Sequence, residues 1–332
     1  MASETYDVVV IGGGAAGLSG ALALARARRS VLVIDAGAQR NAPAGHVHNY
    51  LGREATSPGD LLASGRAEIA GYGGKVVTGT VISAHAVEHP EGTAVAFHVE
   101  LAGGRAVLAR RLLVTTGLVD ELPDVPGIAE RWGRDVLHCP YCHGWEVRDQ
   151  AIGVLASGPF ATHQALLFRQ WSADVTLFLH TAPDPDPDQW EQLAARGIEV
   201  VVGEVAAVEG TDGGLTGVRL TSGQLVPRQV LVVMPRFVAR ADVLTTLGLQ
   251  PIEQQMDGHV IGSYVPAGPT GATAVTGVWV AGNVVDLVAR VINAAAAGLS
   301  AAAALNADLI AEDTRHAVAA HRRRDPVAAA TA

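Results

Sequence analysis

Apolar residues near the start of the chain form short runs separated by a glycine turn and a segment with helical spacing. Residues 6–37, YDVVVIGGGAAGLSGALALARARRSVLVIDAG, contain an apolar run, three glycines, a stretch of small and apolar residues, and a second apolar run. Short apolar runs bounded by glycine favour buried strands, and the longer stretch between them favours an amphipathic helix. This segment is predicted to be a βαβ unit.

The same order of elements returns at residues 151–180, AIGVLASGPFATHQALLFRQWSADVTLFLH, which predict a second βαβ-like unit. Between the two units, residues 107–117 predict a strand that ends in Thr-Thr-Gly, and the Pro-rich exit at 118–128 suits a crossing between domains. Residues 276–309 predict a strand, a glycine turn and an Ala-rich helix that completes the first domain.

These patterns predict an α/β fold with two Rossmann-like, nucleotide-binding domains, the second inserted into the first. We expect the first domain to be discontinuous, because its last strand and helix follow the inserted segment. The predicted boundaries are 1–117 for the first part of the outer domain, 118–238 for the inserted domain, 239–315 for the second part of the outer domain, and 316–332 for a C-terminal tail.

The glycine turn of the first unit has the spacing G-x-G-x-x-G. Gly12 permits a tight turn, Gly14 lets the backbone approach a pyrophosphate, and Gly17 lets helix and strand pack closely. The helix that starts here directs free N–H groups and its positive dipole end at phosphate. Asp35 ends the second strand, where its carboxylate can accept hydrogen bonds from ribose hydroxyls. The unit is predicted to bind a nucleotide.

The net charge and the hydropathy of the chain limit the classes of partner that it is expected to bind. A formal charge of −9 and a pI near 5.7 disfavour nucleic acid and anionic membranes. The basic cluster at 321–325, HRRRD, is interpreted as a solvated helix end. The first residues lack the basic start of an export signal, and the apolar stretch 293–305 is too short to cross a bilayer. We therefore expect a cytoplasmic protein without a membrane partner.

Both cysteines of the chain lie in one segment, LHCPYCHGWE, residues 137–146. Cys139 and Cys142 could be half of a metal site, an inert disulfide or a redox dithiol. A structural zinc needs four ligands, and neither a second C-x-x-C nor the adjacent His138 and His143 supplies them easily. No metal is predicted. A redox dithiol requires a second thiol close enough to close a disulfide, which this spacing provides.

The motifs GGGAAG, Thr-Thr-Gly, CPYC and a late Ala-Gly-Asn turn occur in the order found in the low-molecular-weight thioredoxin reductases, and the chain resembles that family over nearly its whole length. The resemblance implies that the discontinuous outer domain binds FAD, that the inserted domain is NAD(P)-binding-like, and that a homodimer forms. It implies the following FAD-binding residues: Gly12, Gly13, Gly14, Ala15, Ala16, Gly17, Asp35, Ala36, Gly37, Arg40, Asn41, Asn49, Val81, Thr116, Gly117, Gly282, Asn283 and Val291.

The cysteine motif resembles one branch of this family more than the others. CPYCHG is similar to the C-P-[FY]-C-H-G of the gliotoxin- and holomycin-type dithiol oxidases, whereas the reductases have an acid after the second cysteine. The resemblance implies that Cys142 meets the flavin and that Cys139 exchanges with substrate. His143 replaces the acid, and an imidazole can take a thiol proton near neutral pH. His143 is the predicted general base, and His46 and His48 are candidates to line the substrate pocket.

The inserted domain departs from a reductase at its nucleotide turn. Where G-x-G-x-x-A is expected, the chain has Ala156 to Ala161, ASGPFA, and Pro159 removes a backbone N–H from a phosphate loop. The aspartates of 183–188, PDPDPD, would repel the 2′-phosphate of NADPH, so NADPH is a doubtful cofactor. We predict an FAD-dependent dithiol oxidase that forms an intramolecular disulfide in a small natural-product dithiol, with oxygen as electron acceptor. The alternatives are an NADPH-dependent thioredoxin-disulfide reductase and a non-catalytic dithiol-binding protective protein.

Overall fold

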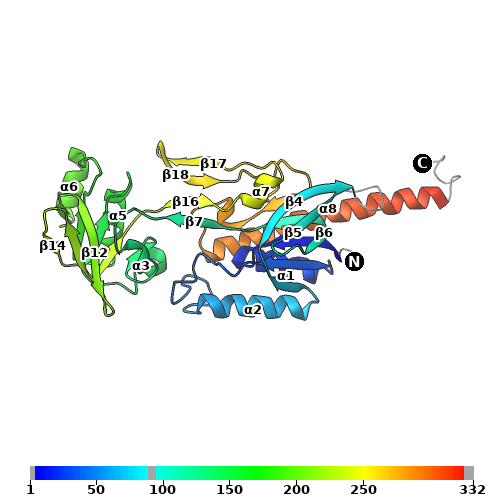
Figure 1. Cartoon of the computed structure of the whole chain (residues 1–332), viewed down its shortest axis with the longest axis horizontal. Coiled ribbons are helices and arrows are strands. Elements are labelled where there is room, and N and C mark those ends of the chain that lie inside the picture. The colour runs from blue at the N-terminus through cyan, green and yellow to red at the C-terminus, as the bar shows by residue number, and fades with distance from the viewer. Residues whose placement is uncertain (1–3, 89–94, 325–332) are drawn as a thin grey trace.

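The computed structural model of the chain describes residues 4–88 and 95–324, which form two lobes in an elongated molecule (Figure 1). The first and last described residues both belong to the larger lobe. The smaller lobe contains the segment between two connecting strands, β7 (Leu118–Glu121) and β16 (Arg236–Ala239), which pair antiparallel.

The larger lobe is built on a seven-stranded sheet of order β3-β2-β1-β6-β5-β4, with β19 also on β6. Strands β1, β2, β3, β6 and β19 run parallel, and the β4–β5 hairpin continues from β6 antiparallel. Its strands are β1 (Glu4–Ile11), β2 (Val31–Asp35), β3 (Lys75–Thr78), β4 (Val81–Glu88), β5 (Val95–Leu101), β6 (Ala106–Val114) and β19 (Val278–Val280). Its helical elements are α1 (Ala15–Arg26), α2 (Pro58–Gly71), α7 (Asp242–Thr246), η1 (Gly282–Val284) and α8 (Val291–Arg324).

The smaller lobe has a parallel five-stranded sheet of order β11-β10-β9-β15-β8 and an antiparallel three-stranded sheet, β12-β13-β14. The strands are β8 (Val136–Leu137), β9 (Ile152–Leu155), β10 (Val175–Phe178), β11 (Glu199–Val201), β12 (Val205–Thr211), β13 (Gly214–Leu220), β14 (Leu225–Val226) and β15 (Val230–Val232). The helices are α3 (Ile128–Arg131), α4 (Pro140–His143), α5 (Ala161–Phe168) and α6 (Pro187–Ala195). Both predicted βαβ units are present, as β1-α1-β2 and β9-α5-β10.

The connecting strands join a fourth sheet, β17-β18-β16-β7, with β17 (Ile252–Met256) and β18 (His259–Tyr264). A hydrophobic cluster at this junction contains Leu118, Phe237, Ile261 and Leu287. The predicted domain boundaries at 117/118 and 238/239 fall at the two ends of this connection; the division into domains itself stays a prediction.

Helix α8 packs against α1 through small residues. A Cβ on Gly298 would lie 2.0 Å from the carbonyl oxygen of Ala16, so only glycine permits this approach. By length and composition α8 is apolar enough to cross a membrane, although the sequence indicated too short a stretch. Its buried face, which includes Ala301 and Leu305, contributes instead to the core of the larger lobe.

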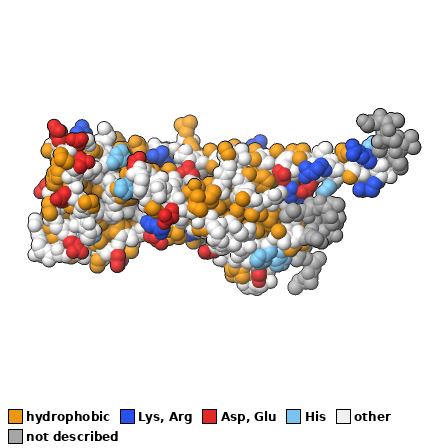
Figure 2. All heavy atoms as spheres, turned by 90° about the horizontal axis from the view of Figure 1, so that it is seen from above, with side chains coloured by type: hydrophobic (Ala, Val, Ile, Leu, Met, Phe, Trp, Pro, Cys, Tyr) orange, Lys and Arg blue, Asp and Glu red, His pale blue; other side chains and the backbone are white. Residues whose placement is uncertain are grey.

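The far end of α8 extends beyond the sheet (Figure 1). The helix continues without a break through residue 316, where a tail was expected, to Arg324. Figure 2 shows basic side chains gathered at this end, where residues 321–324 are exposed. This placement agrees with a solvated helix end for the basic cluster; Asp325 lies outside the described residues.

Candidate active site

A cavity of about 660 Å³ lies where the two lobes meet, and residues of both lobes line it. From the larger lobe come the glycine turn after β1, the end of β2, the Thr-Thr-Gly segment and the start of α8. From the smaller lobe comes the cysteine segment, including Cys139, Cys142 and His143. The motifs that the sequence placed far apart therefore share one cavity.

The glycine turn has the shape that a nucleotide needs. Gly12 has a φ of 106°, and a Cβ there would lie 2.5 Å from the oxygen of Thr115. Gly17 lies against the oxygen of Gly12, which a Cβ would approach to 1.9 Å. A Cβ on Gly14, by contrast, would meet no protein atom within 4 Å. Gly14 begins α1 without a capping side chain, so the first-turn N–H groups are available to a phosphate.

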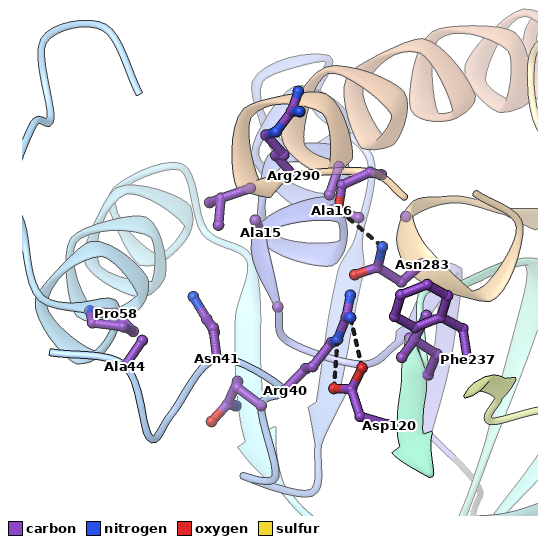
Figure 3. Close-up of a pocket in the computed structure, with 18 of the residues that line it drawn as sticks. Ala15, Ala16, Arg40, Asn41, Ala44, Pro58, Asp120, Phe237, Asn283 and Arg290 are labelled. Atoms are coloured by element: carbon purple, nitrogen blue, oxygen red, sulfur yellow. Dashed lines mark hydrogen bonds and ion pairs between the residues drawn. The ribbon is translucent and has the colours of Figure 1, made fainter. Parts of the chain in front are cut away.

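Hydrogen bonds to neighbouring residues orient two polar side chains on the cavity wall, Asn283 and Arg40. Asn283 donates its amide N–H groups to the oxygens of Asp286 and Ala289, at 3.0 and 2.9 Å, so its side-chain oxygen remains as an acceptor. In Figure 3, Asn283 points toward Arg40 and Asp120. Arg40 donates two hydrogen bonds to Asp120, at 2.8 and 2.7 Å. An open glycine turn, an uncapped helix and an acceptor at position 283 fit FAD.

The structure places most of the predicted cofactor residues on the cavity wall. These are Gly12, Gly13, Gly14, Ala15, Ala16, Asp35, Ala36, Arg40, Asn41, Val81, Thr116, Gly117, Gly282, Asn283 and Val291. Gly17, Gly37 and Asn49 lie outside it. Gly17 packs against the backbone of Gly12. Gly37 donates its backbone N–H to the Asp35 carboxylate at 3.3 Å. Asn49 donates its amide N–H to the carbonyl oxygen of Tyr141. Which of these residues contact the cofactor stays a prediction.

Cys139 is the N-cap residue of the single-turn helix α4, and Cys142 is the third residue of that helix. The N–H groups of Cys142 and His143 both lie 3.2 Å from the carbonyl oxygen of Cys139. This turn holds both cysteine side chains on the same wall of the cavity. The pair is half-buried and unbridged in this structure, which is the reduced form of a dithiol.

The pKa values of the two cysteine thiols are shifted in opposite directions. Hydrogen bonds from the Cys142 thiol and backbone outweigh burial and, with the charge of Arg290, lower the pKa of Cys139 to about 6. The hydrogen bond to Cys139 and burial raise the pKa of Cys142. The guanidinium of Arg290, which directly precedes α8, also lies 4.7 Å from the ring centre of Tyr141. Arg290 is not among the residues predicted from the sequence, although it lies only seven residues after Asn283 in the same cavity-lining segment.

The histidines differ in their surroundings. Burial lowers the pKa of His143, partly opposed by the charge of Glu146, which favours the neutral form of the imidazole. Burial and the charge of Arg40 lower the pKa of His138 to about 4. His138 contacts the oxygen of Val233, at 3.3 Å from Nδ1, which suits a structural residue. His46 and His48 line the cavity as expected.

The nucleotide turn of the smaller lobe lies next to the junction between the lobes. Phe160 precedes α5 and packs with Met234 and Tyr264 against the junction cluster. Its ring also lies edge-on to His259 of β18. After β10, Asp186 caps α6 through a hydrogen bond from the N–H of Gln189 at 2.8 Å, which gives the acidic stretch a structural role.

Within residues 4–88 and 95–324, no group of three or more His, Cys, Asp or Glu residues is arranged to hold a metal ion.

Comparisons with known proteins cover nearly the whole chain. A family model described as pyridine nucleotide-disulphide oxidoreductase matches residues 6–298. Thioredoxin reductase tcpT of Claviceps purpurea is 31% identical over 320 residues, which are 93% of this chain and 96% of the relative.

Two solved structures are similar over both lobes. The crystal structure of HlmI is 46% identical with a TM-score of 0.87, over 96% of each chain. The oxidoreductase from Agrobacterium tumefaciens is 36% identical with a TM-score of 0.84, over 92% of this chain and 99% of that one. The likeness therefore includes the cysteine segment as well as the glycine turn.

Proposed function

The chain belongs to the pyridine nucleotide-disulphide oxidoreductase family, and from this premise we propose that it is an FAD-dependent dithiol oxidase. Its substrate is a small-molecule dithiol, in which the enzyme closes an intramolecular disulfide. Molecular oxygen is the final electron acceptor, in line with the resemblance to the gliotoxin- and holomycin-type oxidases. The enzyme is a cytoplasmic homodimer in this proposal.

One observation carries the proposal: Cys139, Cys142 and the neutral imidazole of His143 line the same cavity as the nucleotide-binding glycine turn. A neutral imidazole accepts a thiol proton near neutral pH, whereas an ordinary carboxylate does so poorly. A base of this kind suits an enzyme that removes protons from incoming thiols.

The sulfur chemistry follows from the disulfide form of the pair. His143 takes the proton of one substrate thiol, and the resulting thiolate attacks the sulfur of Cys139. A mixed disulfide forms as the Cys139–Cys142 bond breaks, and the bonding electron pair leaves on Cys142. The second substrate thiolate then displaces Cys139, which closes the substrate disulfide and leaves two electrons on the enzyme dithiol. FAD, when bound, supplies the two-electron acceptor for that dithiol.

The smaller lobe supports an electron donor other than NADPH. Pro159 lacks the N–H that a phosphate loop would use, and the adjacent Phe160 packs against the junction cluster. The acidic residues that follow β10 carry the wrong sign for a 2′-phosphate. The names of relatives such as thioredoxin reductase tcpT favour a second candidate, an NADPH-dependent thioredoxin-disulfide reductase.

Anaerobic stopped-flow spectroscopy separates the two candidates. Purified enzyme with bound FAD is mixed with NADPH or with dithiothreitol and larger cyclic dithiols, and the visible flavin absorbance is followed. We expect rapid bleaching by at least one dithiol and negligible bleaching by NADPH. Readmitted oxygen should restore the absorbance, with formation of hydrogen peroxide.

Cys139→Ser and Cys142→Ser are the matched controls, because each removes one sulfur and keeps a similar side-chain size. Both should abolish bleaching by dithiols. Bleaching by NADPH as fast as by the dithiols would favour the reductase. A single stoichiometric dithiol-binding event without oxygen consumption would favour a protective binder.

A further inference from the structure

The cavity wall beside the dithiol carries a positive charge that no acidic residue balances. Arg290, the residue directly before α8, lines the cavity together with Cys139 and Tyr141. In the part of the chain that the structure describes, its guanidinium forms no ion pair and donates no hydrogen bond to an oxygen. Asp286, the nearest acidic residue in the sequence, instead accepts the N–H of Val288 at 3.1 Å. Arg290 therefore has room for an anionic partner from outside the chain.

The other two arginines on the cavity wall already have partners. Arg40 donates two hydrogen bonds to the carboxylate of Asp120, and Arg240 donates one to the carbonyl oxygen of Ala38 at 2.8 Å. Figure 3 shows Arg290 at the start of α8, apart from the Arg40–Asp120 pair. The first turn of α8 contains no acidic residue, so the positive end of this long helix is not neutralised either. The cavity is therefore electropositive at the start of α8.

Tyr141 holds this positive charge close to the reactive sulfur. The guanidinium of Arg290 lies 4.7 Å from the centre of the Tyr141 ring, and Tyr141 follows Cys139 by two residues in α4. The ring also makes an edge contact with Trp171, at 5.9 Å between ring centres, and the Tyr141 carbonyl oxygen accepts the amide N–H of Asn49. Because the ring covers one face of the guanidinium, the N–H groups in its plane stay accessible. A molecule that exchanges with Cys139 comes within their reach.

We propose that Arg290 binds a carboxylate of the substrate, so that the enzyme prefers small dithiols that carry this group. The inference rests on the proposed oxidase function. The planar guanidinium presents N–H donors in a fork that matches the two oxygens of a carboxylate. Substrate arrives while Cys139 and Cys142 are joined as a disulfide, and Cys139 then carries no negative charge that could balance Arg290. A neutral dithiol would leave the cation to water alone.

The same cation favours release of the product. When the second substrate thiolate displaces Cys139, that sulfur leaves as a thiolate, which Arg290 stabilises. The thiolate and the carboxylate then compete for one guanidinium, so the oxidised product is held less tightly than the substrate. Arg290 thus contacts the substrate directly and determines specificity.

The experiment compares dithiols that differ only in this group: dihydrolipoate with dihydrolipoamide, and the shorter dihydroasparagusate with its amide. For each dithiol, the second-order rate constant of anaerobic flavin bleaching is measured with FAD-bound enzyme at neutral pH. In wild type, at least one acid should react about tenfold or more faster than its amide, the size of effect expected for a hydrogen-bonded charge pair. High salt should reduce this preference. In Arg290→Met, the ratio of acid to amide should approach unity.

The ratio removes any effect of Arg290 on the reactivity of Cys139, because a change in the cysteine alters the rates of acid and amide equally. Arg290→Lys keeps the charge without the fork and should keep part of the preference. Arg148→Met is the matched control: the Arg148 guanidinium also lies over an aromatic ring, that of Trp145 at 4.2 Å, but it lies outside the cavity wall. The ratio in this variant should equal that of wild type.

Equal bleaching rates of acid and amide in the wild-type enzyme would overturn the carboxylate site, as would a preference that Arg290→Met leaves intact. If Arg290→Met does not retain FAD, the salt dependence of the wild-type preference and the ratio in Arg290→Lys decide in its place, and both the preference at high salt and that ratio must fall. If the amides bleach the flavin, the oxidase function stands whatever the ratio. If no dithiol bleaches it, the oxidase function fails, and the carboxylate site fails with it.

Discussion

Cys139 owes its low pKa to neighbours that come from both lobes. The thiol and backbone of Cys142 are local, but Arg290 lies about 150 positions later in the chain, just before α8. A lowered pKa makes thiolate the main form of Cys139 above pH 6, where it can exchange with substrate or close the enzyme disulfide. The C-x-x-C motif indicated the dithiol, whereas this charge could only be found in the folded chain.

We predict that alkylation of the reduced enzyme by iodoacetamide rises with pH through a midpoint of about 6 and then levels off. Cys139→Ser should remove that phase. Arg290→Met should move the midpoint upward, because the guanidinium no longer stabilises the thiolate, while Arg236→Met, a surface variant paired with Glu121, should leave it in place. A midpoint insensitive to Arg290→Met would contradict this account.

The glycine turn allows stability and cofactor binding to be separated. Gly17→Ala places a methyl group 1.9 Å from the oxygen of Gly12 and should destabilise the apoprotein strongly. Gly14→Ala meets no protein atom within 4 Å, so apoprotein melting should change little while FAD affinity falls. Thermal melting with and without FAD, together with FAD titration, measures both effects. Equal losses of FAD affinity at unchanged stability would show that the turn is not packed as described.

Residues whose role depends on near neighbours in the chain could be predicted from the sequence, whereas residues whose partners are distant in the chain could not. Gly12, Gly14 and Cys139 belong to motifs whose spacing alone carries their meaning. For His48, the only indication in the sequence was its position next to Asn49. Its partner Glu146 lies in the other lobe, far away in the chain. Asn49, which is predicted to bind the cofactor, donates its amide N–H to the carbonyl oxygen of Tyr141 in the other lobe, and no motif indicated that contact.

At the scale of elements, α8 combines two kinds of packing. Its small residues, which the sequence showed, allow the close approach to α1. Its middle part carries Glu312, which binds Arg110 and Arg111 of β6 at 2.5 and 2.6 Å. An ion pair between residues about 200 positions apart leaves no periodic signal, so the sequence could not reveal it.

Glu312→Gln should lower the free energy of unfolding by about 1–3 kcal/mol at neutral pH, because the buried guanidinium of Arg111 would keep only the more exposed Asp308 as a charged partner. The two arginines lower the pKa of Glu312 against the opposing effect of burial. The contribution of the carboxylate is therefore present above its ordinary pKa of 4.5 and is lost as the pH falls through the lower folded value.

Urea unfolding of wild type and variant across the acid range measures this difference, which should shrink toward low pH. Asp308→Asn is the control: Asp308 also binds Arg111, at 2.6 Å, but its side chain is 36% exposed. Its loss should cost less than about 1 kcal/mol. A difference between wild type and Glu312→Gln that stays constant with pH would rule out the carboxylate charge as its cause.

At the scale of the whole molecule, the α/β fold with two Rossmann-like lobes and the family resemblance are confirmed. The repeated strand–helix–strand order made the fold predictable, because it depends on periodicity alone. The relative placement of the lobes was not predictable, since it depends on contacts such as that of Phe160 with His259 of β18, which have no local pattern. That placement brings the cysteines to the flavin cavity.

Because β7 and β16 pair with each other, the chain enters and leaves the smaller lobe at the same place. Glu121 and Arg236 face each other across β7 and β16 and also form an ion pair at 3.0 Å. Removal of residues 122–235 would leave two chain ends already side by side, which a short hairpin turn could join. In topological terms, the smaller lobe with its cysteine segment can therefore be replaced by another insertion without a change in the strand order of the larger lobe.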